Sequence, residues 1–172
     1  RSQRVSFQQA HQDRIVRTTE KAAIELFGGW GLLLRPSGPS PMTDGVSAMV
    51  PLTGDCLHGV AGLEINDALV QLLPNVGGVG PRHWAKELAN QLTGRLRNEL
   101  LSDGVDVDMG VPSSLHFGRV TLGPAQLGAT EFFLRCGDGV VRVFFDFDPL
   151  ADPGFGQALE AAPLAEGQSL FF

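Results

Sequence analysis

Apolar residues recur with helical spacing in two long segments of the chain. Between Asp13 and Phe27, one apolar stripe is formed by Ile15, Thr19, Ala22, Ala23 and Leu26. These positions lie at i, i+4, i+7, i+8 and i+11, which predicts an amphipathic helix ending at Gly28-Gly29. A second helix is predicted from Pro81 to about Leu101, because proline favours the first helical position and Gly104 follows the end.

Other segments alternate apolar and polar residues or form short apolar runs between turn residues, which is typical of strands. Val46 to Leu52 and Cys56 to Ile65 are predicted to form a hairpin around Thr53-Gly54-Asp55. A second hairpin is predicted from Ala129 to Cys136 and Val140 to Asp148, around Gly137-Asp138-Gly139. Three more strands are predicted, at Trp30 to Arg35, Val105 to Val111 and Arg119 to Leu122. A proline-rich loop at Pro36 to Pro41 follows the first of them, and Pro112 ends the second.

Asn66 is a predicted N-cap of a short helix that stops at Pro74. The element order is therefore helix, three strands, two helices and four strands. Because the strands connect mostly through hairpins, we expect an α+β fold with two layers, a largely antiparallel sheet and two long helices on one face. Residues 1–149 form the predicted domain, with its N-terminal helix included, and residues 150–172 a C-terminal tail, with one short helix near Gln157 to Ala161.

Composition and charge narrow the function classes. The 172 residues carry a formal net charge of −6 and no basic run, so nucleic acid is not an expected partner. No stretch approaches the ~18 apolar residues of a membrane span, and the first residues carry no secretory signal. Because the chain does not begin with Met, we expect further residues upstream of Arg1. The two isolated cysteines, Cys56 and Cys136, fit buried side chains in a reducing, cytoplasmic compartment.

Several common catalytic and metal-binding patterns are absent from the sequence. It contains neither a phosphate-binding P-loop nor a G-x-S-x-G nucleophile elbow. The four histidines, at positions 11, 58, 83 and 116, are scattered without ligand spacing, so no metal site is predicted.

The helix that begins at Pro81 carries the candidate site. At roughly 100° per residue, Trp84, Ala85, Leu88, Leu92 and Leu96 share one side. His83, Glu87, Asn90 and Gly94 share the side away from the core. Asn and Gly are poor residues for a helix interior, which suggests close approach by another molecule. From the spacing alone, an ordinary solvated face remains the favoured interpretation.

A resemblance to a known family favours a functional face over an ordinary solvated one. Glu87-Leu88-Ala89-Asn90, followed by Gly94 and later by Pro112, resembles the E-x-x-N motif and proline of the CheX/CheC/FliY chemotaxis phosphatases. The hairpin with Gly59 to Asn66, the segment Val105 to Pro112 and the hairpin Phe132 to Phe147 are also similar to parts of that family. The resemblance covers roughly Asp13 to Phe147.

The resemblance implies a CheX-like phosphatase that hydrolyses the aspartyl phosphate of a phosphorylated CheY-like response regulator. Asn90 would orient the attacking water, and Glu87 would pair with the regulator's active-site lysine. Gly94 and His83 would lie in the partner-binding surface. The regulator would bring Mg²⁺, so this chain needs no cofactor of its own. The single motif implies a CheX-type chain, and the family's CheX members pair as homodimers.

The motif departs from the family pattern at two neighbouring positions. His83 stands where relatives often have Asp or Ser, and Arg95 follows the glycine where a small or amide residue is common. The alternative function is therefore a catalytically silent module that binds a receiver domain or another signalling partner. A third option is a structural subunit of a motor or polar assembly.

Overall fold

The computed structural model describes residues 2–55, 57–73, 78–118 and 130–149. The elements in these ranges are α1 (Ser2–Gly28), β1 (Arg35–Ser37), β2 (Gly45–Thr53), β3 (Leu57–Asn66), α2 (Asp67–Val70), α3 (Pro81–Ser102), β4 (Asp108–Met109), β5 (Ser113–Phe117), β6 (Thr130–Cys136) and β7 (Gly139–Pro149).

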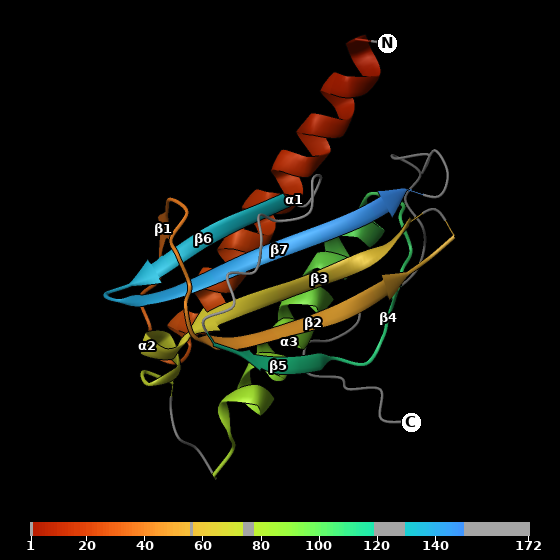
Figure 1. Cartoon of the computed structure of the whole chain (residues 1–172). Helices are drawn as coiled ribbons and strands as arrows, with labels where there is room; N and C mark the ends of the chain where they lie inside the picture. The colour runs from red at the N-terminus through yellow and green to blue at the C-terminus, as the bar shows by residue number, and fades with distance from the viewer. Residues whose placement is uncertain (1, 56, 74–77, 119–129, 150–172) are drawn as a thin grey trace.

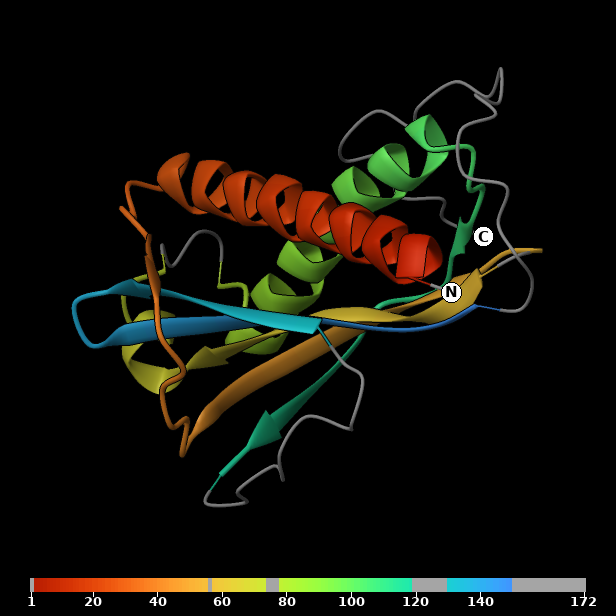
Figure 2. The ribbon, with the colours of Figure 1, turned by 90° about the horizontal axis from the view of Figure 1, so that it is seen from above.

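The described strands form one antiparallel sheet in the order β1-β6-β7-β3-β2-β4, and β5 also pairs with β2. Both long helices, α1 and α3, lie on the same face of this sheet (Figures 1 and 2). The predicted α+β fold, with two layers and a largely antiparallel sheet, is therefore confirmed.

The core lies between the sheet and the inner side of α3. Alternate residues of the central strands face the helices, because side chains alternate between the two faces of a sheet. The buried residues on this side include Val46, Ala48, Val50, Ala61, Leu63, Ile65, Val141, Val143, Ala85, Leu88, Leu92 and Leu96. The apolar face predicted for α3 is thus the face that anchors the helix.

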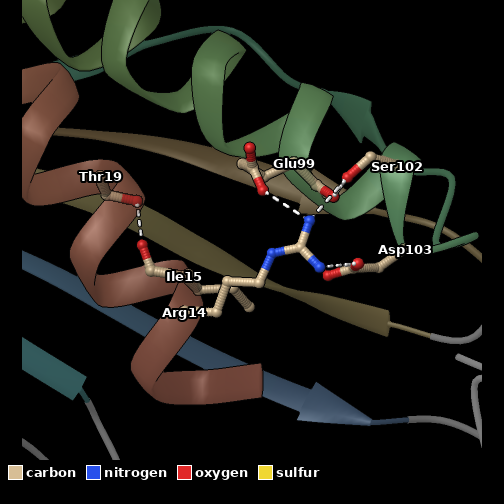
Figure 3. A network of polar contacts seen from close by, with 6 residues as sticks. All are labelled: Arg14, Ile15, Thr19, Glu99, Ser102 and Asp103. Atoms are coloured by element: carbon tan, nitrogen blue, oxygen red, sulfur yellow. Dashed lines mark hydrogen bonds and ion pairs between the residues drawn. The ribbon is translucent and has the colours of Figure 1, made fainter. Parts of the chain in front are cut away.

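Arg14 of α1 forms hydrogen bonds with residues at the C-terminal end of α3 (Figure 3). Its guanidinium donates to Asp103 Oδ1 at 2.7 Å and to Glu99 Oε2 at 3.1 Å. Near the other end of α1, the Trp30 ring meets the Trp84 ring edge-on, with 4.7 Å between centroids. The last turn of α3 is therefore joined to α1 by polar contacts, and its first turn contacts the residues just after α1 through an aromatic pair.

The opposite face of the sheet carries a charged cluster centred on Arg142. Its guanidinium donates to Glu64 Oε2 at 3.0 Å and to Glu131 Oε2 at 2.6 Å, and it lies 5.5 Å from the Phe144 ring centroid. Burial acts to lower the pKa of Arg142, but the bonds and charge of Glu64 and Glu131 outweigh it, and the pKa is raised. Since Glu64 is only 5% exposed, Arg142 compensates a carboxylate that water barely reaches.

Local sequence signals placed α3 and both hairpins correctly, whereas the short helix predicted to stop at Pro74 begins after Asn66 as expected but already ends at Val70. The Asn66 side chain caps α2 by accepting from the Leu69 N–H at 3.0 Å. Gly104 has a φ of 83°, as expected of a glycine that ends a helix. Gly137, with a φ of 59°, forms the predicted turn between β6 and β7. Cys136 is half-buried rather than fully buried.

The predicted start of the first helix was wrong. α1 begins at Ser2 rather than Asp13, because residues 2–12 contain neither proline nor glycine to interrupt it, although no apolar stripe marks them. Its predicted end is confirmed at Gly28, but the glycine with a left-handed conformation is Gly31, with a φ of 79°.

Two predicted strands were wrong in their extent. Trp30 to Arg35 is not a strand, because β6 ends opposite this segment at the Gly137 turn and pairs only from Arg35 onward. Pro36 then belongs to edge strand β1, where its missing N–H is tolerated. Val105 to Val111 pairs only at β4, because the Val107 carbonyl accepts from Arg97 Nε at 2.6 Å instead of joining the ladder.

One further strand of the sheet was not predicted. β5 (Ser113–Phe117) pairs with β2, although its serines and its histidine give it a weak strand signal. The predicted strand from Arg119 to Leu122, the tail helix near Gln157 to Ala161, and Cys56 lie outside the described residues.

Candidate functional site

The start of α3 follows from two residues of the sequence. Gly80 occupies the N-cap position without a side-chain cap, and Pro81 follows at the first helical position. Arg82 donates to the Ser114 carbonyl of β5 at 2.7 Å. Near the other end of the helix, Arg97 donates to the Val107 carbonyl. The segment between these two carbonyls, which includes Pro112, therefore runs alongside α3.

The outer side of α3 carries the four residues predicted from the sequence. His83 is exposed, whereas Glu87, Asn90 and Gly94 are half-buried. Buried residues occupy the opposite side of the helix. His83, Glu87, Asn90 and Gly94, called here the α3 strip, thus lie together on one outward line of the helix, as predicted.

A hydrogen bond restrains the carboxylate of Glu87. Its Oε1 accepts from Gln91 Nε2 at 2.7 Å, one helical turn along α3. Gln91 was not among the predicted site residues, although Glu and Gln at i and i+4 are known to interact on helices. The bond occupies one carboxylate oxygen and restrains the side chain, and the second oxygen accepts no hydrogen bond from the described residues.

The Asn90 carboxamide makes no hydrogen bond with the described residues. A carboxamide offers two donor hydrogens and an acceptor oxygen, but it is not a base at neutral pH. Such a group can hold and orient a polar molecule at the helix surface, and it cannot abstract a proton from it. Asn90 is therefore suited to positioning rather than to acid–base chemistry.

Nothing within the described chain requires glycine at position 94. A Cβ atom built on Gly94 would meet no atom within 4 Å, and the residue has no positive φ. By contrast, a Cβ on Gly62, in β3, would come within 2.6 Å of the Ala48 carbonyl oxygen. Glycine inside a helix is unfavourable, and no close contact within the described residues accounts for Gly94.

We expect Gly94→Ala to stabilise the protein by about 1 kcal/mol, because alanine loses less conformational entropy in a helix. Urea unfolding followed by circular dichroism measures this change. A larger substitution, Gly94→Gln, should keep the fold but weaken any interaction in which a partner approaches the α3 strip. A destabilised Gly94→Ala variant would show that the fold itself uses this glycine.

The cationic side chain that follows Gly94 points away from the strip. Arg95 Nη1 lies 3.0 Å from Glu25 Oε2 of α1, so its charge is compensated in the seam between the two helices. Arg97 Nη2 lies 3.2 Å from Asp106 Oδ1 on the other flank. The departure from the family pattern at Arg95 therefore serves helix packing and does not obstruct the strip.

No metal-binding cluster of three His, Cys, Asp or Glu side chains occurs within residues 2–55, 57–73, 78–118 and 130–149. In the same ranges, no helix has the length and apolarity to cross a membrane. The groups that the strip offers to another molecule are thus a carboxylate, a carboxamide, an imidazole and a bare stretch of backbone at Gly94.

Comparison of the coordinates with solved structures identifies the fold. The chemotaxis protein CheX from Vibrio vulnificus superimposes with a TM-score of 0.65 at 18% identity, over 78% of this chain and 96% of that protein. A CheC-like protein from Shewanella sp. PV-4 matches with the same score and identity, over 78% of this chain and 97% of the other. This chain has the CheX fold.

A third neighbour with the CheX fold is a complex. The CheX chain bound to CheY, beryllium trifluoride and Mg²⁺ from Borrelia burgdorferi matches with a TM-score of 0.54 at 14% identity, covering 77% of this chain and 96% of that chain. No family model and no curated protein matches the sequence. The CheX fold is therefore recognised through the backbone, at identities of 14% to 18% in the three structures.

Proposed function

We propose that this protein is a phosphatase that hydrolyses the aspartyl phosphate of a CheY-like response regulator in chemotaxis or two-component signalling. One observation carries the proposal: a restrained carboxylate, an unengaged carboxamide and an otherwise unexplained helix-interior glycine lie together on the outer line of α3. They do so in the fold of CheX, and one CheX neighbour is captured with CheY, beryllium trifluoride and Mg²⁺.

The proposed reaction requires only two side chains of this protein, one to orient water and one to dock the regulator. Water attacks phosphorus in line with the bond to the aspartyl oxygen, that bond breaks, and inorganic phosphate and a free carboxylate result. Mg²⁺ held by the regulator stabilises the phosphoryl charge, as in other phosphoryl transfers. Asn90 would accept a hydrogen bond from the water and fix its direction of approach. Glu87 would pair with the regulator's lysine and so place the helix against the phosphoryl group.

The proposal is tested by following phosphate release from phosphorylated CheY-like receivers with Mg²⁺, with and without this protein. Acceleration that scales with protein concentration supports it. Binding to a receiver without any acceleration would instead support the silent receiver-binding module.

Glu87→Ala should raise the KM for the phosphorylated receiver by about 10- to 100-fold, because it removes one partner of a charge pair that docking desolvates. Its kcat should change much less, since Glu87 does not hold the water. Steady-state kinetics separates the two constants, and Glu20→Ala, on α1 and outside the strip, is a matched control. A Glu87→Ala variant with wild-type affinity for the receiver would contradict the docking role.

A further inference from the structure

The four Lys and Arg side chains of α3 differ in whether they form ion pairs. Arg95 and Arg97, in the second half of the helix, are paired with Glu25 and Asp106. Arg82 and Lys86, in the first half, form no ion pair with the described residues. Arg82 is exposed and makes its hydrogen bond to a neutral carbonyl of Ser114, which leaves its charge uncompensated.

Arg82 and Lys86 lie in line with the candidate catalytic amide. Positions 82, 86 and 90 are spaced by four residues, so the two cations and Asn90 form one row of neighbouring side chains on α3. Arg82 reaches toward β5, which places this row on the flank of the α3 strip nearest β5. We call Arg82 and Lys86 the basic row.

The basic row is unfavourable for the isolated domain. Two like charges four residues apart repel each other, and cations at the start of a helix oppose its dipole. The first turn of α3 contains no acidic residue to offset them. The chain has 19 acidic and 13 basic residues, so carboxylates are available, yet none forms an ion pair with these two cations among the described residues.

We propose that the basic row docks an acidic surface of the phosphorylated receiver beside its phosphoryl group, which rests on the proposed function. A receiver that holds Mg²⁺ at an aspartyl phosphate needs further carboxylates as metal ligands. The rim of such a site is therefore acidic. When Asn90 approaches the phosphoryl group, Lys86 reaches this rim one helical turn away, and Arg82 extends the contact along the row.

The test is binding of a CheY-like receiver loaded with beryllium fluoride and Mg²⁺, measured by calorimetry between 0.05 and 0.5 M salt. We expect Lys86→Ala to weaken binding by about 3- to 10-fold at low salt and Lys86→Glu by more, with both losses shrinking as salt screens the contact. Lys86→Arg should bind like the wild type. Lys21→Ala is the matched control. Lys21 is the only other lysine in the chain, and it lies on α1, where its Nζ is 3.8 Å from Glu25 Oε1.

In turnover, Lys86→Ala and Lys86→Glu should raise KM and leave kcat unchanged, whereas Lys86→Arg should match the wild type in both constants. Equal affinities for Lys86→Ala and Lys21→Ala, or a loss that does not shrink with salt, would overturn the inference. Salt-sensitive binding that depends on Lys86 without any phosphate release would support the basic row while refuting the phosphatase function. Equal acceleration of phosphate release by the wild type and by Lys86→Ala would support the phosphatase function while refuting the basic row.

Discussion

Asn90→Ala is expected to reduce the kcat for receiver dephosphorylation by about 100-fold, because an attacking water that is no longer held rarely reaches the in-line position. Binding of the receiver should change by less than about twofold, since the docking contacts lie on Glu87 and the basic row. The variant should remain folded, because alanine is favoured over asparagine inside a helix by about 0.5 kcal/mol.

Single-turnover kinetics with phosphorylated receiver measures this effect without interference from product release. Asn90→Asp tests the amide more sharply, because it keeps the side-chain shape but replaces two donor hydrogens with a negative charge that repels the phosphoryl group. Gln71→Ala, an exposed amide at the end of α2, is the control. Unchanged turnover in Asn90→Ala would remove the water-positioning role, and equal loss of binding and turnover would reassign Asn90 to docking.

Arg142→Met is expected to destabilise the fold by about 2–4 kcal/mol, because it leaves Glu64 buried without its cation. The Glu64 side chain is 7% exposed and can gain little solvation when its partner is removed. Glu131, at 32%, can turn toward water and should contribute less. Because this cluster lies on the sheet face opposite α3, kcat at temperatures where the variant is folded should be retained.

The double variant Arg142→Met/Glu64→Met provides the discriminating control. Replacing both members of a buried ion pair by apolar groups is often nearly neutral, so most of the lost stability should return. Arg135→Met removes an exposed arginine that bonds only to Ser40 among the described partners and should cost less than about 0.5 kcal/mol. Thermal and urea unfolding compare the three. A single variant as stable as the wild type would show that Glu64 is solvated without Arg142.

Features that depend on neighbouring residues could be predicted from the sequence. The β6–β7 hairpin follows from its glycine turn, and the cap of α2 follows from Asn66. The α3 strip follows from helical geometry alone, since side chains three, four and seven residues apart must share a face. The fold class follows from the order of these elements.

Features that depend on distant residues could not be predicted. The extent of β1 is set by where β6 ends, and the Val105 to Val111 segment joins the sheet only at β4, since Arg97 donates to the Val107 carbonyl just before it. The orientation of Arg95 depends on Glu25, seventy residues earlier in the chain. At the site, only the Gln91 contact to Glu87 had a local signal, and the Glu-to-Gln spacing could have revealed it.

The side chains of the α3 strip project outward from one helix whose inner side is fixed in the core. A helix surface of this kind curves away from its ligand, so a small acyl phosphate such as acetyl phosphate would touch one or two groups and diffuse away. Discrimination would then rest on the area of contact with a whole receiver domain rather than on the shape of a cleft. The dephosphorylated receiver would offer nearly the same area, and it would therefore compete with the phosphorylated form and act as a product inhibitor.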